Sequence, residues 1–214
     1  MKIKFYIKFA YHYFYDNIYT RLVSNFYLLK WKIYKYKLFN KCDKPTILYI
    51  SFINGGGLLK HINELITGMK DTYDVWVFTN DNFVTHYDGN KKIIFKHDLD
   101  LNSAIRCVNP DIIHVHQLSK TLWEIPFIEW EKSIITIHDM YYVCPYFFMT
   151  ECMNDKFCHP SLCNIEWRNE MHGILVRCKS IICPSVAMKD LLLFYYPDIE
   201  NKITIIEHGI NKLC

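Results

Sequence analysis

The sequence shows neither of the segments that carry a chain into or across a membrane. Its first residues interleave lysine with tyrosine and phenylalanine and include no smooth apolar stretch ending in small residues, as a secretory signal would. No run reaches the roughly 18 apolar residues needed to span a bilayer. We therefore expect a cytoplasmic protein whose nine cysteines are mostly reduced thiols.

Several familiar site signatures are also missing. The Gly-Lys-Ser/Thr ending of a P-loop is absent, and no predicted helix carries a His-x-x-x-His pair that would indicate a metal. The net charge of +3 is too small to indicate a nucleic-acid partner by itself. These absences exclude a P-loop protein, and we expect no nucleic-acid partner.

Charge is unevenly distributed along the chain. Residues 1–44 hold ten Lys or Arg and two acidic residues, a net charge of +8, whereas the remainder carries −5. This basic segment is rich in aromatic residues, a combination that suits a membrane surface with anionic lipid. It also suits an RNA-stacking surface, or a helix that packs on the domain or on a partner domain. Peripheral contact with the inner face of the membrane is the functional interpretation that we favour.

A regular alternation of strands and helices begins after Pro45. Strands are expected at 46–52, 73–79, 92–97, 111–118, 133–138, 180–185 and 202–209, and helices at 58–69, 101–108, 121–130 (broken), 166–178 and 186–196. Several strands are continuous apolar runs, as in a parallel sheet covered on both faces. We predict an α/β fold with a Rossmann-like, doubly wound parallel sheet over residues 45–210, preceded by a basic aromatic helical extension over 1–44.

Polar residues gather at the carboxyl ends of the predicted strands, where ligands bind in such sheets. His116 and His138 end neighbouring strands, Asp139 follows the second of them, and Ser185 ends a later strand. His61 lies one turn into the first helix. A single histidine at a strand end is more often structural than catalytic, but three at one edge make a site about as plausible as a structural role.

Three consecutive glycines, Gly55, Gly56 and Gly57, separate the first strand from the first helix. They leave backbone N–H groups uncovered, and these groups favour an anion together with the helix dipole. The dinucleotide fingerprint Gly-x-Gly-x-x-Gly fits only in part, because Lys60 stands at the third glycine position. The loop thus indicates a phosphate cradle or a turn without ligand. A nicotinamide-dependent oxidoreductase stays open, with Asp81 as the acidic residue after the second strand.

A long loop after residue 139 carries four cysteines, at spacings of seven, five and four intervening residues: Cys144, Cys152, Cys158 and Cys163. This is not the paired Cys-x-x-Cys of a zinc ribbon. Reduced thiols are the first interpretation, and a structural Zn²⁺ held by these four residues is the alternative.

An ordered series of motifs resembles the N-terminal domain of family 4 glycosyltransferases, the retaining GT-B enzymes. The series consists of NGGGLLKHINEL, NPDIIHVHQL, SIITIHDMYYVCP, SIICPSVAMKDLL and ITIIEHGIN, and the resemblance covers about three quarters of the chain. It implies one GT-B half that, with a second domain, transfers a sugar from a nucleotide-sugar to a glycan or lipid-linked acceptor. Residues 211–214 would begin the linker to that domain.

The resemblance also implies roles for individual residues. Gly55, Gly56 and Gly57 would face the donor diphosphate, with His61 nearby. His138 and Asp139 would be the catalytic residues, with His138 beside the transferred sugar and Asp139 next to it. Residues His116, Ser185 and Gly209 would line the cleft. Neither a metal nor another cofactor is implied for transfer, because the nucleotide-sugar is a co-substrate.

The sequence departs from the family pattern in two places. His208 replaces the asparagine of the Asn-Gly segment, and the Glu-x7-Glu donor motif of the second domain does not occur in the 214 residues. We therefore expect this chain alone to transfer little sugar, with a C-terminal GT-B domain or a partner chain supplying the rest of the site. A non-catalytic binding half of a split glycosyltransferase is the alternative.

The membrane interpretation predicts that residues 1–44 bind anionic lipid. The full chain should co-sediment with vesicles that contain an anionic phospholipid, and deletion of residues 1–44 should abolish this binding, because the deletion removes a net charge of +8 and most of the clustered aromatic rings. Uncharged vesicles serve as the control. Equal co-sedimentation of the two proteins would rule the interpretation out.

Overall fold

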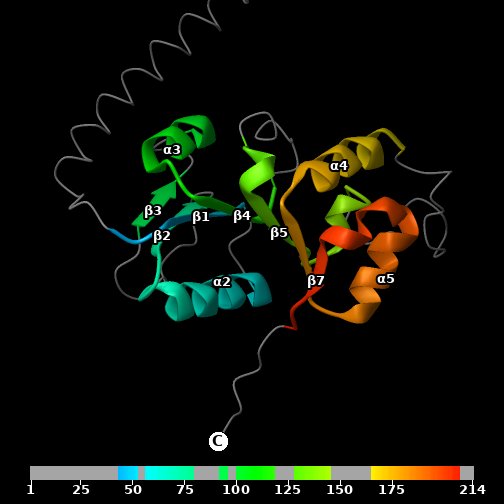
Figure 1. The fold of residues 1–214 in the computed structure, drawn as a ribbon, viewed down its shortest axis with the longest axis horizontal. Helices are drawn as coiled ribbons and strands as arrows, with labels where there is room; N and C mark the ends of the chain where they lie inside the picture. The colour runs from blue at the N-terminus through cyan, green and yellow to red at the C-terminus, as the bar shows by residue number, and fades with distance from the viewer. Residues whose placement is uncertain are drawn as a thin grey trace, which may run out of the picture.

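A computed structural model of the protein describes residues 43–52, 56–79, 92–95, 100–118, 128–145 and 165–207. In these ranges one sheet holds seven parallel strands in the order β3-β2-β1-β4-β5-β6-β7 (Figure 1). The strands are β1 (Thr46–Ser51), β2 (Asp74–Thr79), β3 (Lys92–Phe95), β4 (Ile112–Gln117), β5 (Ser133–Thr136), β6 (Ser180–Cys183) and β7 (Ile203–Ile205). This order confirms the predicted doubly wound, Rossmann-like sheet.

Four α-helices are described: α2 (Gly56–Met69), α3 (Leu101–Val108), α4 (Ile165–Arg177) and α5 (Val186–Tyr195). Each coincides with a predicted helix to within two residues. The end of α3 illustrates how local residues fix a helix boundary. Asn109 adopts a left-handed backbone with φ of 47° and donates its N–H to the Ile105 carbonyl. Pro110, which follows, cannot continue the helix. Among the described residues, no helix is long and apolar enough to cross a bilayer.

Two predicted elements differ from the structure. The last strand was expected from residue 202 to 209, but Pro197–Lys202 forms a 3-10 helix and β7 covers Ile203–Ile205. Residues 208 and 209 of the predicted strand lie outside the described ranges. The broken helix predicted over 121–130 is described only from residue 128 onward. There the structure has a 3-10 turn at Trp130–Lys132, which leads directly into β5. Residues 121–127 lie outside the described ranges. Short 3-10 turns escape a periodicity argument because they are too brief to show a repeat.

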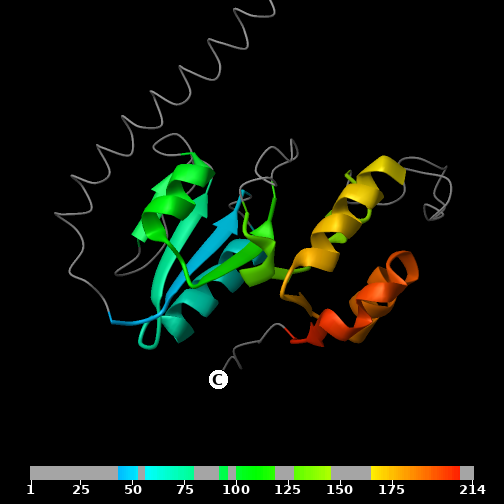
Figure 2. The same ribbon diagram turned by 45° about the horizontal axis from the view of Figure 1, so that its top comes forward.

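The core lies on both faces of the sheet. On one face, Ile47 and Tyr49 of β1 pack with Val75 and Val77 of β2 beneath α2. On the other face, the alternate residues of the same strands join α3, and this larger core extends to α4 and α5 (Figure 2). Because strand side chains alternate between faces, each buried strand needs apolar residues at successive positions, which explains the continuous apolar runs in the sequence.

The strands are added to the sheet on one side of β1 first and then on the other. From β1 the chain moves outward through α2 to β2 and β3, and it then returns over α3 to β4 on the other side of β1. The carboxyl ends of β1 and β4 therefore flank the topological switch point, where doubly wound sheets bind their ligands. The register between the two strands shifts there, since Ile50 faces Val115 whereas Ser51 faces Gln117. His116 is the additional residue at this irregularity.

Candidate functional site

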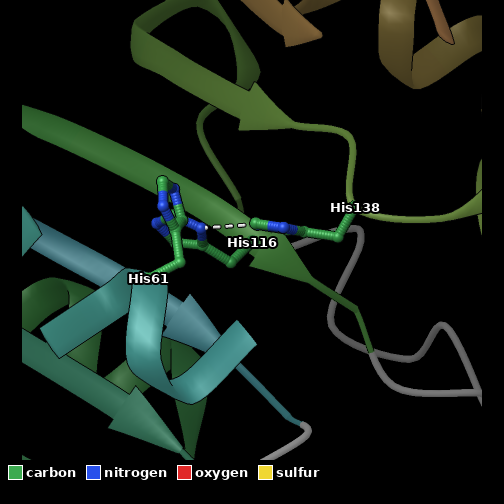
Figure 3. A group of neighbouring side chains, drawn as sticks. All are labelled: His61, His116 and His138. Carbon is green, nitrogen blue, oxygen red and sulfur yellow. Dashed lines mark hydrogen bonds between the residues drawn. The ribbon is translucent and has the colours of Figure 1, made fainter. Parts of the chain in front are cut away.

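Three histidines meet at the switch point. His61 comes from the second turn of α2, His116 from the end of β4, and His138 from the segment that follows β5 (Figure 3). Nδ1 of His116 and Nε2 of His138 lie 2.9 Å apart in a hydrogen bond. The His61 ring centroid lies 5.7 Å from that of His116 and 5.3 Å from that of His138. The structure thus brings together three residues that the sequence analysis placed at one sheet edge.

The register of the sheet explains why these side chains converge. His114 of β4 faces Ile134 of β5, and Tyr49 of β1 pairs with His114 on its other side. His116 lies two residues beyond His114 in β4, and its ring centroid is 5.3 Å from that of Tyr49, which packs in the core beneath α2. His138 follows the end of β5 by two residues. The helix α2 begins directly after the loop that follows β1, so its second turn lies over the same edge.

A fourth histidine lies below this group. His114 is buried, and its Nε2 is 2.8 Å from Oγ1 of Thr136. Burial, followed by the electrostatic influence of His138 and His61, lowers the pKa of His114 to about 3. The ring is therefore neutral at physiological pH and serves to support its neighbour His116, whose ring centroid lies 4.1 Å away. The sequence analysis gave His114 no role, because a buried polar pair across two strands leaves no local pattern.

The N-terminus of α2 lies at the same edge of the sheet. Gly56 and Gly57 form its first turn, which contains no acidic residue, while Gly55 lies outside the described residues. A Cβ added at Gly57 would meet no heavy atom within 4 Å, so the backbone there is open to a ligand. Lys60, which breaks the dinucleotide fingerprint, has a side chain that is 72% exposed and lies 3.9 Å from Glu64 on the outer surface of the helix.

Asp139 caps the 3-10 helix Met140–Tyr142. Its Oδ1 accepts a hydrogen bond of 2.9 Å from the backbone N–H of Tyr141. Burial raises the pKa of this carboxyl group, and the hydrogen bond from Tyr141 partly opposes that effect. Asp139 therefore holds the segment that follows His138, and its catalytic role stays a prediction.

Ser185 also has a structural task, because its Oγ caps α5 by accepting a 3.1 Å hydrogen bond from the backbone N–H of Met188. Its cleft-lining role stays a prediction. Gly209 lies outside the described residues, as do Cys152, Cys158 and Cys163, so the proposed zinc set is represented by Cys144 alone, whose thiol is buried.

The hydrogen bond between His114 and Thr136 predicts a stability effect. Thr136→Val keeps the volume of the side chain but leaves a buried imidazole nitrogen without its hydroxyl partner. The substitution should lower the free energy of unfolding by about 1–3 kcal/mol, measured by urea denaturation. Thr204→Val, at an exposed position on β7, is the matched control and should change stability little. Equal effects of the two substitutions would contradict the assignment.

Comparison of the sequence with known families assigns the chain to one of them. The sequence profile of Glycosyltransferase Family 4 matches residues 55–212, a range that includes all three histidines and most of the sheet. No curated protein matches the chain. The matched range covers well over half of the 214 residues. The chain therefore belongs to Glycosyltransferase Family 4, and its function is of the glycosyltransferase kind.

Proposed function

We propose that this chain forms the acceptor-side wall of a site that transfers a sugar from a nucleotide-sugar to a polysaccharide or lipid-linked acceptor. The observation that carries the proposal is the meeting of two features at one switch point. The first is the open N-terminal turn of α2, and the second is the cluster of three imidazole rings from His61, His116 and His138. One suits an anionic diphosphate, and the other suits the polar surface of a sugar.

The donor diphosphate is assigned to the first turn of α2. A helix of 14 residues presents its unpaired N–H groups there, together with the equivalent of about half a positive elementary charge. No acidic residue in that turn opposes an anion, and Gly57 lacks a side chain that would keep phosphate oxygens away from the backbone. These are the electrostatic and steric conditions under which helix N-termini bind phosphate.

His138 is assigned to the transferred sugar. Its hydrogen bond to His116 fixes the plane of the ring, and His116 is itself 2% exposed and so has little freedom to move. A fixed imidazole presents its polar atoms in one orientation, which favours a group that must recognise hydroxyls or developing charge. His61 completes this wall from the helix side. Retention of the anomeric configuration is proposed from the family resemblance.

The described residues form a single Rossmann-like unit, whereas the donor in a GT-B enzyme lies between two such units. We therefore keep the expectation that residues 1–214 alone release only traces of nucleoside diphosphate from a nucleotide-sugar. The measurement is a coupled assay for that product in the presence of candidate acceptors. Robust turnover by the pure chain would overturn this expectation while leaving the family assignment in place.

Substitution at Gly57 tests the diphosphate assignment. Gly57→Glu places a carboxylate in the open turn, where it should repel a diphosphate and weaken the binding of nucleotide-sugars by at least about tenfold, or roughly 1.4 kcal/mol. Gly57→Gln has nearly the same shape without the charge and is the matched control. Both proteins should fold, because the added side chain meets no neighbour and an acid in a first helical turn is stabilising.

Binding is measured by tryptophan-fluorescence titration with UDP-, GDP- and ADP-sugars, and with NADH for comparison. The proposal expects at least one nucleotide-sugar to bind more tightly than NADH and to discriminate the two Gly57 variants. Equal affinity of both variants for every ligand would sink the diphosphate assignment. Preference for NADH would instead favour the oxidoreductase alternative.

A further inference from the structure

A buried amide at the switch point lacks a partner within the described part of the chain. Gln117 is the last residue of β4, and it is 5% exposed. Its Nε2 is buried and meets no hydrogen-bond acceptor among the described residues. Because a buried N–H group without an acceptor destabilises a fold, its presence in a native structure needs an explanation. At a ligand-binding edge, the ligand can supply that acceptor.

The position of Gln117 in the sheet puts this amide at the edge that carries the candidate site. Gln117 pairs with Ser51 at the irregular end of the β1–β4 ladder. Ser51 is the last residue of β1, and the chain leads from there into the open first turn of α2. Gln117 also directly follows His116, whose Nδ1 bonds His138. The amide therefore shares the carboxyl edge with both features assigned to the donor, although neither assignment uses it.

We propose that Gln117 is a specificity-determining residue that donates its side-chain N–H to a hydroxyl oxygen of the sugar bound at the switch point. The inference deepens the proposed sugar transfer and rests on it. It gives the sugar a contact in addition to those assigned to the imidazole rings. A site with such a buried donor selects sugars that carry a hydroxyl group where the donor points, because a sugar without that group leaves the amide unpaired.

The chemistry of the amide favours a hydroxyl group over a phosphate. A carboxamide holds N–H donors and a carbonyl acceptor side by side, so it can donate to one hydroxyl oxygen and accept from the same or a neighbouring hydroxyl. Diphosphate oxygens only accept hydrogen bonds, and their charge is already matched by the N–H groups and dipole at the start of α2. An uncharged group that both donates and accepts suits the hydroxyl-bearing edge of a sugar ring.

Packing holds this amide in place before a ligand binds. The residues on either side of Gln117 in the sequence, His116 and Leu118, are each 2% exposed. The strand β4 that carries Gln117 is paired with β1 on one side and with β5 on the other. A buried and pre-positioned donor bonds a substrate oxygen strongly, because little water competes and little conformational entropy is lost on binding.

Two other buried polar side chains of the sheet show what a structural role looks like. The ring of His114 pairs with the Thr136 hydroxyl, and the Ser133 hydroxyl donates to the Glu129 carbonyl at 2.6 Å. Both groups have their partners within the chain, so their removal should destabilise the fold. Gln117 differs, since the loss of its unpartnered amide should stabilise the ligand-free chain. Residues placed for a ligand rather than for the fold commonly show this opposition between stability and binding.

The substitution Gln117→Met separates a ligand-binding role from a structural one. Methionine has nearly the length of glutamine but no amide, so the ligand-free variant should melt at a higher temperature than the unaltered chain. Ser133→Ala is the matched control. It removes a partnered hydroxyl at the start of β5, on the opposite edge of the sheet, and should lower the melting temperature. Differential scanning calorimetry of the full chain and both variants measures these shifts.

Calorimetric titration of the same three proteins measures sugar binding. The ligands are UDP-, GDP- and ADP-sugars, the sugar-free UDP, GDP and ADP, and short oligosaccharides. Gln117→Met should weaken binding of the sugar-bearing ligand by at least about tenfold and leave nucleoside diphosphate binding unchanged, whereas Ser133→Ala should bind every ligand like the unaltered chain. A loss confined to nucleotide-sugars assigns the hydroxyl to the donor, and a loss confined to oligosaccharides assigns it to the acceptor.

Analogues of the bound sugar that each lack one hydroxyl group identify the contact. The unaltered chain should bind one of these analogues at least about tenfold more weakly than the parent sugar, because its buried N–H then has no acceptor. Gln117→Met should bind that analogue and the parent sugar equally, since the variant has no amide to leave unpaired. A residue that acts only through the fold would weaken all the analogues alike.

Three outcomes would overturn the proposal. They are a lower melting temperature for Gln117→Met, sugar affinity unchanged by that substitution, and equal weakening of nucleotide-sugars and their nucleoside diphosphates, which would place the amide against phosphate. In each case the unaltered chain still binds a nucleotide-sugar, so the proposed function stands. Failure of the unaltered chain to bind any of the sugar-bearing ligands would instead overturn the proposed function, and this inference with it.

Discussion

The parallel pairing of β1 with β4 is the contact on which the rest of the site depends. It joins the outward-moving half of the sheet to the returning half, and both strands are buried from end to end apart from their first residues. Their shared carboxyl edge receives the start of α2 from one side and His116 from the other. The register shift after Ile50 lies at this edge, where irregular pairing can redirect a side chain without loosening the core behind it.

The same edge combines two kinds of electrostatics in a small volume. The N-terminal turn of α2 offers partial positive charge from backbone groups, whereas the three histidines offer the ring nitrogens of their imidazoles. Burial keeps His114 neutral beneath them, so the layer that supports the group adds no positive charge to it.

Much of the site was predictable because local rules govern it. The strand-glycine-helix order places α2 next to β1, and a histidine at a strand end points to the carboxyl edge in any parallel sheet. Other features were not predictable. Asp139 and Ser185 are both engaged in capping, which depends on the backbone angles adopted in the fold. The buried pair of His114 and Thr136 comes from strands separated by 22 positions, and no local pattern records such a contact.

By itself, the sequence determined the class of fold, since apolar runs alternating with amphipathic segments can bury their side chains only in a covered parallel sheet. It also indicated that His116 and His138 would stand at the carboxyl edge of the sheet. Only the tertiary structure decided how those residues meet: that His61 reaches His116 and His138 from another element, and that Lys60, one residue earlier, lies on the outer surface. The reason is physical, because helical periodicity turns adjacent residues about 100° apart, and packing on the sheet selects which of them faces inward.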